Sequence, residues 1–133
     1  MYECMRMPRI SSKVLYPELS YKIYGLCFEV HNRLGRFRNE KIYADALEES
    51  LIKDNIKYQH EHALDKSFEG EKARRNIPDF IINDQIIIDI KAKRIITKED
   101  YFQMKRYLVS SGKKLGIIVN FRQTYLNPKR IVN

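Results

Sequence analysis

The chain has 133 residues, of which 44% are hydrophobic and 32% charged, and this mixture favours one globular domain over a disordered or fibrous chain. Its 25 Lys and Arg residues exceed its 17 Asp and Glu residues, so the formal net charge is +8 and a polyanionic partner is favoured. The two cysteines form no disulfide framework, and no stretch has the pattern of a secretory signal or a membrane span, so a cytoplasmic protein is expected.

The first part of the chain is expected to be helical after an irregular start. Residues 1–15 are expected to be loosely ordered, which places a single domain at residues 16–133. Apolar positions follow helical spacing over residues 17–34, and Gly35 is suited to end that helix. Asn39 can cap a second helix. The buried stripe of that helix would be formed by Tyr43, Ala44, Leu47 and Leu51.

Strand patterns follow the second helix. Residues 56–63 and 68–77 alternate weakly and are interpreted as two strands around a turn at residues 69–71. Residues 80–82 and 86–90 are β-branched runs separated by Asn, Asp and Gln, which predicts a strand, a turn and a strand.

A third helix and a further strand complete the predicted elements. Thr97 can cap a helix over residues 98–111, with Asp100 as its capping-box partner and Gly112 at its end. Residues 115–121 form a nearly unbroken apolar run, as expected for a strand covered on both faces. The order of helix, helix, strands, helix and strand predicts an α/β or α+β fold with helices packed on a sheet.

Two carboxylates interrupt the apolar strands of the predicted hairpin. Asp89 and Lys91 are two residues apart, so they share one face of their strand. A three-residue turn would pair Ile82 with Ile86 and place Asp79 opposite Asp89, whereas a two-residue turn would put the carboxylates on opposite faces. Facing carboxylates repel unless a cation lies between them, and oxygen ligands suit Mg²⁺ or Mn²⁺. An ion pair at an exposed strand end is the alternative interpretation of the Asp-x-Lys pattern.

Polar residues on the predicted helices can join this site. Glu40 precedes the apolar stripe of the second helix by one turn, so it is expected to face the sheet; its alternative role is to complement the helix dipole. Gln103 and Tyr107 are four residues apart and share one face of the third helix, where they either join the site or form an amphipathic flank.

The positive charge is concentrated in the C-terminal half. Residues 1–71 contain 11 basic and 12 acidic residues, whereas residues 72–133 contain 14 basic and 5 acidic residues. This asymmetry favours a surface that faces phosphates, although any single basic pair can equally be a solvated surface. The residues expected to contact nucleic acid are Arg74, Arg75, Lys93, Arg94, Lys105 and Arg106.

Several stretches together match a known family. They are residues 28–35, 40–43, 78–80, 89–92, 120–121 and 129–132, with Gln103 and Tyr107. From about Tyr21 to its end the chain resembles the GxxExxY family, a branch of the PD-(D/E)XK nuclease superfamily. It departs from that family at Phe37, which occupies the glycine position of the name-giving motif, and at Asp89, where the family usually has Glu.

The resemblance implies a restriction-endonuclease-like core, with a central mixed β-sheet flanked by helices, and a metal-dependent phosphodiesterase site. By this analogy Asp79 and Asp89 hold Mg²⁺ or Mn²⁺ together with the carbonyl of Ile90, and Glu40 completes the shell directly or through water. Lys91 would position the attacking water. Gln103 and Tyr107 match a helix motif that orients the catalytic lysine or the nucleic acid.

The first functional hypothesis is therefore a metal-dependent nuclease that hydrolyses phosphodiester bonds of nucleic acid, with DNA ahead of RNA. The second is a domain of the same fold that binds nucleic acid or another partner without turnover, because sites can decay on a retained fold. The third is a scaffold whose basic residues only keep it soluble. No membrane partner is expected, and a homodimer is compatible with the chain.

Overall fold

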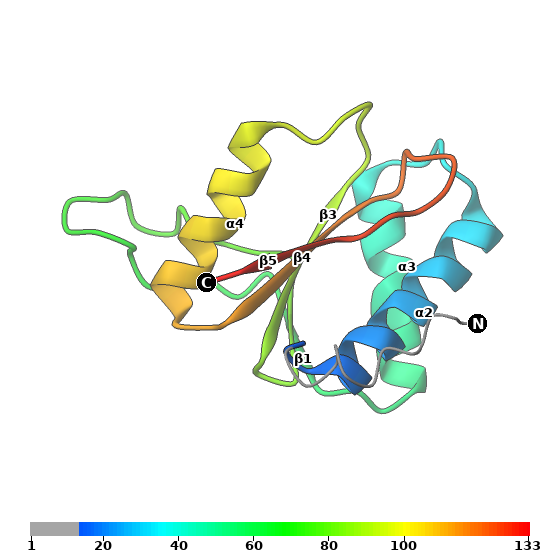
Figure 1. Cartoon of the computed structure of the whole chain (residues 1–133), viewed down its shortest axis with the longest axis horizontal. Coiled ribbons are helices and arrows are strands. Elements are labelled where there is room, and N and C mark those ends of the chain that lie inside the picture. The colour runs from blue at the N-terminus through cyan, green and yellow to red at the C-terminus, as the bar shows by residue number, and fades with distance from the viewer. Residues whose placement is uncertain (1–13) are drawn as a thin grey trace.

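A computed structural model describes residues 14–133, which contain three α-helices and one five-stranded sheet (Figure 1). The expectation of a loosely ordered start concerns mainly residues 1–13, which lie outside the described residues. In chain order the elements are α2 (Pro17–Leu34), α3 (Glu40–Lys53), β1 (Tyr58–His60), β2 (Phe80–Ile82), β3 (Ile86–Lys91), α4 (Lys98–Ser111), β4 (Leu115–Asn120) and β5 (Lys129–Val132).

The three predicted helices are confirmed, and their ends follow from local capping. Gly35 ends α2 with a positive φ of 79°, a conformation that glycine adopts without steric cost. The Asn39 side chain accepts a hydrogen bond from the Ile42 N–H (2.9 Å) at the start of α3. The Asp100 carboxylate accepts one from the Thr97 N–H (2.8 Å) at the start of α4.

The sheet is mixed, with strand order β1-β2-β3-β4-β5. The β3–β4 pair is parallel and is connected through α4, whereas the other three pairs are antiparallel. Ile82 pairs with Ile86 across the β2–β3 hairpin. The three-residue turn is thus confirmed, and the two-residue alternative is wrong. The α+β class and the central mixed sheet flanked by helices are confirmed as well.

The strand predictions before and after this hairpin need correction. The predicted strand over residues 56–63 shrinks to the three residues of β1, and the strand predicted over residues 68–77 is wrong, because this segment is an irregular loop. Its buried groups satisfy one another through side chains rather than through a backbone ladder, as described for Glu71 below. β5 was not predicted as a strand, because its Lys129–Arg130 pair was interpreted only as surface charge.

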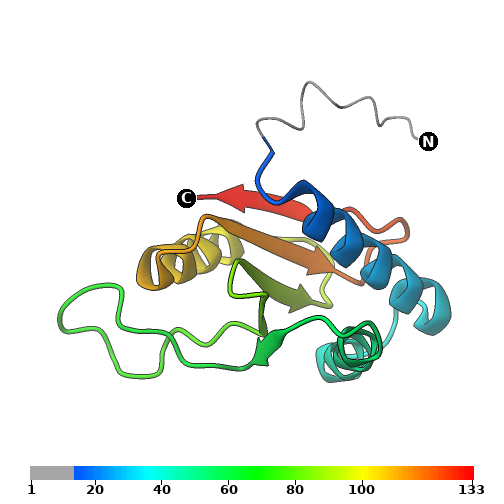
Figure 2. The same ribbon diagram turned by 90° about the horizontal axis from the view of Figure 1, so that it is seen from below.

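The helices form a layer on each face of the sheet (Figure 2). Helices α2 and α3 cover one face, where Ile23 and Leu47 belong to the same buried cluster as Ile88 and Ile117. Helix α4 covers the other face. A Cβ added at Gly116 of β4 would overlap the Met104 sulfur of α4, so this helix packs directly on the strand backbone. No helix within residues 14–133 combines the length and apolar character of a membrane span.

Candidate active site

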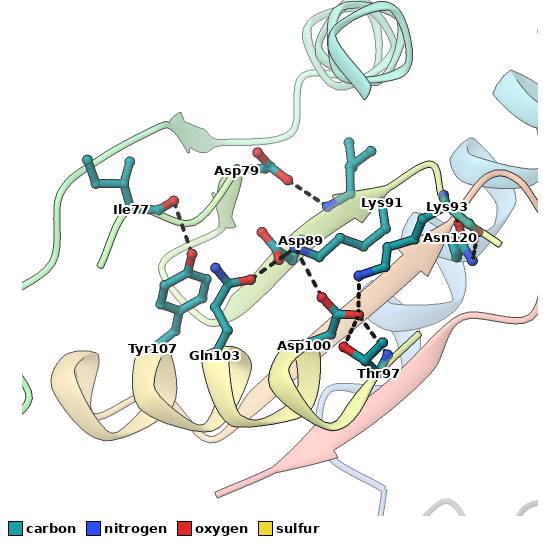
Figure 3. Close-up of polar contacts among 11 residues, drawn as sticks. Ile77, Asp79, Asp89, Lys91, Lys93, Thr97, Asp100, Gln103, Tyr107 and Asn120 are labelled. Carbon is teal, nitrogen blue, oxygen red and sulfur yellow. Dashed lines mark hydrogen bonds and ion pairs between the residues drawn. The ribbon is translucent and has the colours of Figure 1, made fainter. Parts of the chain in front are cut away.

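The hairpin register brings two carboxylates to one end of the sheet. β2 begins at Phe80, opposite Ile88 of β3, so Asp79 and Asp89 lie one residue beyond the last pair. Residues alternate between the two faces of a strand, and Ile81 and Ile87 face α4. Asp79, Asp89 and Lys91 are therefore expected on the α4 face, and Figure 3 shows Asp89 and Lys91 directed toward the side chains of that helix.

Both aspartates are held in place, and Asp89 is also withdrawn from solvent. The Ile90 N–H donates a short hydrogen bond to Asp79 Oδ2 (2.6 Å), which fixes this carboxylate beside the backbone of β3. Asp89 is 4% exposed, and its Oδ2 is buried without a hydrogen-bond donor. Lys91 Nζ lies 3.0 Å from this oxygen as an ion pair, but the two groups do not have the geometry of a hydrogen bond.

Lys91 is the centre of the polar cluster. Its ammonium donates to Gln103 Oε1 (3.0 Å), contacts Asp89, and lies 3.7 Å from Asp100 Oδ1 (Figure 3). Burial alone would lower the pKa of Lys91, but Asp89 and the neighbouring carboxylates outweigh it and raise this pKa above its ordinary value. Lys91 is therefore a fixed cation, a proton donor rather than a base at neutral pH.

The carboxylate pair is short of positive charge. Burial and the neighbouring Asp79 raise the pKa of Asp89 to about 7. Burial and the charge of Glu40 raise the pKa of Asp79, although the Ile90 N–H acts in the opposite direction. A buried and a half-buried carboxylate that lie together and have raised pKa values are what a bound divalent cation would relieve.

The two predicted helix residues reach the same cluster. Gln103 accepts from Lys91, as described above. Tyr107 is 3% exposed, and its hydroxyl donates to the Ile77 carbonyl (3.3 Å), which ties α4 to the segment that leads into Asp79. Burial, followed by the charges of Asp89 and Asp79, raises the pKa of Tyr107, so its hydroxyl stays protonated.

Asp100 was predicted only as a capping residue, yet it also belongs to this cluster. Its Oδ2 accepts from Lys93 Nζ (2.8 Å) in addition to the Thr97 backbone, and its Oδ1 faces Lys91. Burial would raise the pKa of Asp100, but Lys93 and Thr97 outweigh it and lower this pKa, so Asp100 remains a carboxylate. Only the tertiary contact between α4 and β3 reveals this second role.

Glu40 departs from the expectation that it would face the sheet. It lies in the first turn of α3 and is exposed. It does approach the candidate site, since Glu40, His60 and Asp79 line one pocket of about 320 Å³. Within residues 14–133, however, no three Asp, Glu, His or Cys side chains gather closely enough to surround a metal ion.

The basic residues expected to contact nucleic acid divide into two groups. Arg74 and Arg94 are exposed, as are Arg75 and Lys105 of the second group. The other four make contacts within the protein: Arg75 with Glu71 (3.1 Å), Lys93 with Asp100, Lys105 with the Val132 carbonyl (2.8 Å) and Arg106 with Asn76 (2.9 Å). These four residues therefore have structural contacts within the protein, and their binding to nucleic acid stays a prediction.

A second polar cluster was missed by the sequence analysis. Glu71 is buried in the loop before β2 and accepts hydrogen bonds from Ser67 and from the Asn76 side chain (3.0 Å). Arg106 of α4 lies 3.6 Å from the same carboxylate. This cluster anchors the loop that ends at Asp79 against the helix that carries Gln103 and Tyr107.

The family comparison agrees with this arrangement. A family model described as the PD-(D/E)XK nuclease superfamily matches residues 17–131, which is most of the chain. The chain belongs to the PD-(D/E)XK nuclease superfamily. No curated protein and no solved structure matches it. Its sheet and helices are consistent with the restriction-endonuclease-like fold of the superfamily, and membership supports a nuclease-like function in general terms.

The residues of this PD-(D/E)XK domain fit a hard divalent cation. The buried Asp89 Oδ2 lacks a hydrogen-bond donor, and a second carboxylate, Asp79, lies beside it. Carboxylate oxygens are the ligands that Mg²⁺ and Mn²⁺ prefer, and Mg²⁺ commonly keeps several waters when only one or two carboxylates bind it. A site with two close carboxylates and a more distant Glu40 suits this mode of binding.

Proposed function

We propose that this protein is a nuclease of the GxxExxY branch that hydrolyses phosphodiester bonds of nucleic acid, with DNA preferred over RNA, and that depends on Mg²⁺ or Mn²⁺. The observation that carries the proposal is the convergence of Asp79, Asp89 and Lys91 at one end of the hairpin, with Gln103 bound to the lysine. Superfamily membership supports the chemistry in general, and this cluster supplies residues able to perform it.

Under this proposal the metal ligands are Asp79, Asp89 and the Ile90 carbonyl, and Glu40 acts through water because it lies outside the close pair. The exposure of Glu40 and its place in the same pocket as Asp79 support that division. When bound, the ion would lower the pKa of a water molecule and offset the charge that develops on the phosphate.

The remaining residues of the cluster act on water and phosphate. Lys91 is a fixed cation beside Asp89, so it can orient a water molecule and stabilise negative charge on the phosphate oxygens. Gln103 holds the Lys91 ammonium at 3.0 Å and thereby sets its direction. Tyr107 fixes the position of α4 relative to the segment before Asp79.

A cleavage assay tests the proposal with single-stranded, duplex and branched DNA and with RNA, in Mg²⁺, in Mn²⁺ and in a chelator. The wild-type protein should cleave only with metal, and Asp89→Ala and Lys91→Ala should each abolish cleavage while binding persists. Lys113→Ala is the matched control, because Lys113 also pairs with an aspartate (Asp84, 2.8 Å) but lies at the other end of the sheet.

Unchanged cleavage by both site variants would refute the assignment of these residues. Binding that persists in the chelator, without cleavage in either metal, would instead support a domain that binds nucleic acid without turnover. An absence of any salt-sensitive binding would exclude both of these functions.

A further inference from the structure

An exposed aromatic ring lies among arginines next to the candidate site. Phe37, in the connection between α2 and α3, is 73% exposed. The guanidinium carbon of Arg36 lies 4.6 Å from the centroid of its ring, and that of Arg122 lies 5.7 Å away. The combination of an exposed ring with two neighbouring cations suits a ligand that offers both a flat π face and negative charge.

This arrangement is held rigidly. Arg36 Nε donates to the Arg122 carbonyl (2.8 Å), which joins the α2–α3 connection to the segment after β4. The Arg122 N–H donates to Asn120 Oδ1 (3.2 Å) at the end of β4. Tyr43 is buried, and its hydroxyl donates to the Gly35 carbonyl (2.5 Å), which fixes the start of the connection. The backbone that carries the ring is therefore held in place, so less conformational entropy is lost when a ligand contacts the ring.

The ring lines a shallow groove that adjoins the pocket of Asp79. This groove, called the Phe37 groove below, has a volume of about 550 Å³ and is lined by Phe37, Arg38, Glu40, Lys41 and Arg122 among others. Three of these five residues are cations and one is a carboxylate. Glu40 also lines the pocket that contains Asp79, so the groove and the candidate active site share a wall.

We propose that the Phe37 groove binds an unpaired, single-stranded segment of DNA, with one base stacked on the Phe37 ring and the adjoining phosphates near Arg38 and Lys41. This inference rests on the proposed nuclease function and names the form of its substrate. Bases inside a duplex are already stacked on one another and cannot cover an exposed ring, whereas an unpaired base of any type offers a face. Cations beside the ring neutralise the backbone of the same strand.

Equilibrium binding in EDTA tests this inference without cleavage. A single-stranded oligonucleotide that contains 2-aminopurine reports stacking by its fluorescence, and the duplex of the same sequence is the comparison. Phe37→Ala should weaken single-strand binding about 5- to 150-fold, the range that follows from the loss of one stacked base. Phe37→Trp should retain binding and the fluorescence change, and Phe37→Leu should behave like the alanine variant.

A matched control separates stacking from a general loss of apolar surface. Phe68, which is 56% exposed, belongs to the loop before β2, and Figure 1 shows this loop at the opposite end of the molecule from the connection between α2 and α3, so Phe68→Ala should leave affinity unchanged. Arg38→Gln should reduce the slope of log affinity against log salt by about 0.7, the value for one phosphate contact on a single strand. Because Phe37 is exposed, its variants should unfold at the wild-type temperature.

The inference is overturned if Phe37→Ala binds the single strand as tightly as the wild type, or if Phe37→Leu retains full affinity. It is also overturned if Phe37→Ala weakens binding of the duplex as much as binding of the single strand. These outcomes are distinguishable from failure of the proposed function. Unchanged single-strand binding by Phe37→Ala, with intact Mg²⁺-dependent cleavage, would refute only the Phe37 groove, whereas Phe37-dependent binding without cleavage would refute only the nuclease.

Discussion

Replacement of Asp89 by Asn should stabilise the metal-free protein at pH 8. In the folded state, burial and Asp79 raise the pKa of Asp89 to about 7, whereas the ordinary value is 3.8. The folded protein therefore holds this proton more tightly than the unfolded chain. Folding takes up a proton between about pH 4 and 7, so the free energy of unfolding of the metal-free wild type falls as the pH rises through this window.

The size of the effect follows from the difference between the two pKa values. A difference of about three pKa units corresponds to about 4 kcal/mol at most, and no discount for solvent is needed because Asp89 is 4% exposed. Asn has nearly the same shape and cannot ionise, so Asp89→Asn should recover up to this amount at pH 8. Below about pH 4 the two proteins should have similar stability, because Asp89 is protonated in both states there.

Urea denaturation in EDTA, at intervals from pH 4 to 8, gives the free energy of unfolding of the wild type and of Asp89→Asn. The titration of other groups cancels in the difference between these two free energies. Asp84→Asn is the control, because Lys113 lowers the pKa of this exposed carboxylate and its replacement should not stabilise the protein at pH 8. Addition of Mg²⁺ at pH 8 should stabilise the wild type but not Asp89→Asn. The raised pKa of Asp89 would be refuted as the cause if Asp89→Asn were less stable than the wild type at pH 8. It would also be refuted if the difference in free energy of unfolding between the two proteins did not change with pH.

Three further substitutions test the packing and the polar contacts around the site. Gly116→Ala should lower the free energy of unfolding by about 1–3 kcal/mol in urea denaturation, because the added methyl overlaps Met104; unchanged stability would contradict this packing. Glu71→Gln should lower the melting temperature at pH 7 by weakening the contacts with Arg106. Burial alone would raise the pKa of Glu71, but Ser67 and its other partners outweigh burial and lower this pKa. The stability of the wild type should therefore fall as the pH drops through the lowered pKa. If Glu71→Gln lost stability over the same acid range, this role of Glu71 would be refuted. Tyr107→Phe removes the hydrogen bond to the Ile77 carbonyl, so we expect about 1 kcal/mol of lost stability and slower cleavage of DNA, and full cleavage would exclude a positioning role.

Local patterns predicted the parts of this protein that depend on neighbouring residues. The helix ends at Gly35 and Asn39 follow from capping chemistry, and the turn between the two apolar runs left two registers open, of which the three-residue turn puts Asp79 next to Asp89. Such features rest on hydrogen bonds and pairings within about a dozen residues, which a sequence displays directly.

The parts that the sequence did not predict depend on tertiary contacts. β5 has no clear alternation and becomes a strand only because the edge of β4 is available to it. Glu71 was expected in a turn between two strands, but its contacts with Ser67, Asn76 and Arg106 stabilise an irregular loop instead. Glu40 is exposed in the first turn of α3, whereas its helical spacing from Tyr43 and Ala44 predicted that it would face the sheet.

The two edges of the sheet limit how copies of this chain can associate. β1 offers only three residues for pairing, and β5 begins with the adjacent cations Lys129 and Arg130. Short edge strands and edge charges both disfavour continuation of a sheet into another molecule, so these edges resist the strand addition that leads to fibrous aggregates. A homodimer of this protein would accordingly be expected to form through helical or loop surfaces rather than through an extended sheet.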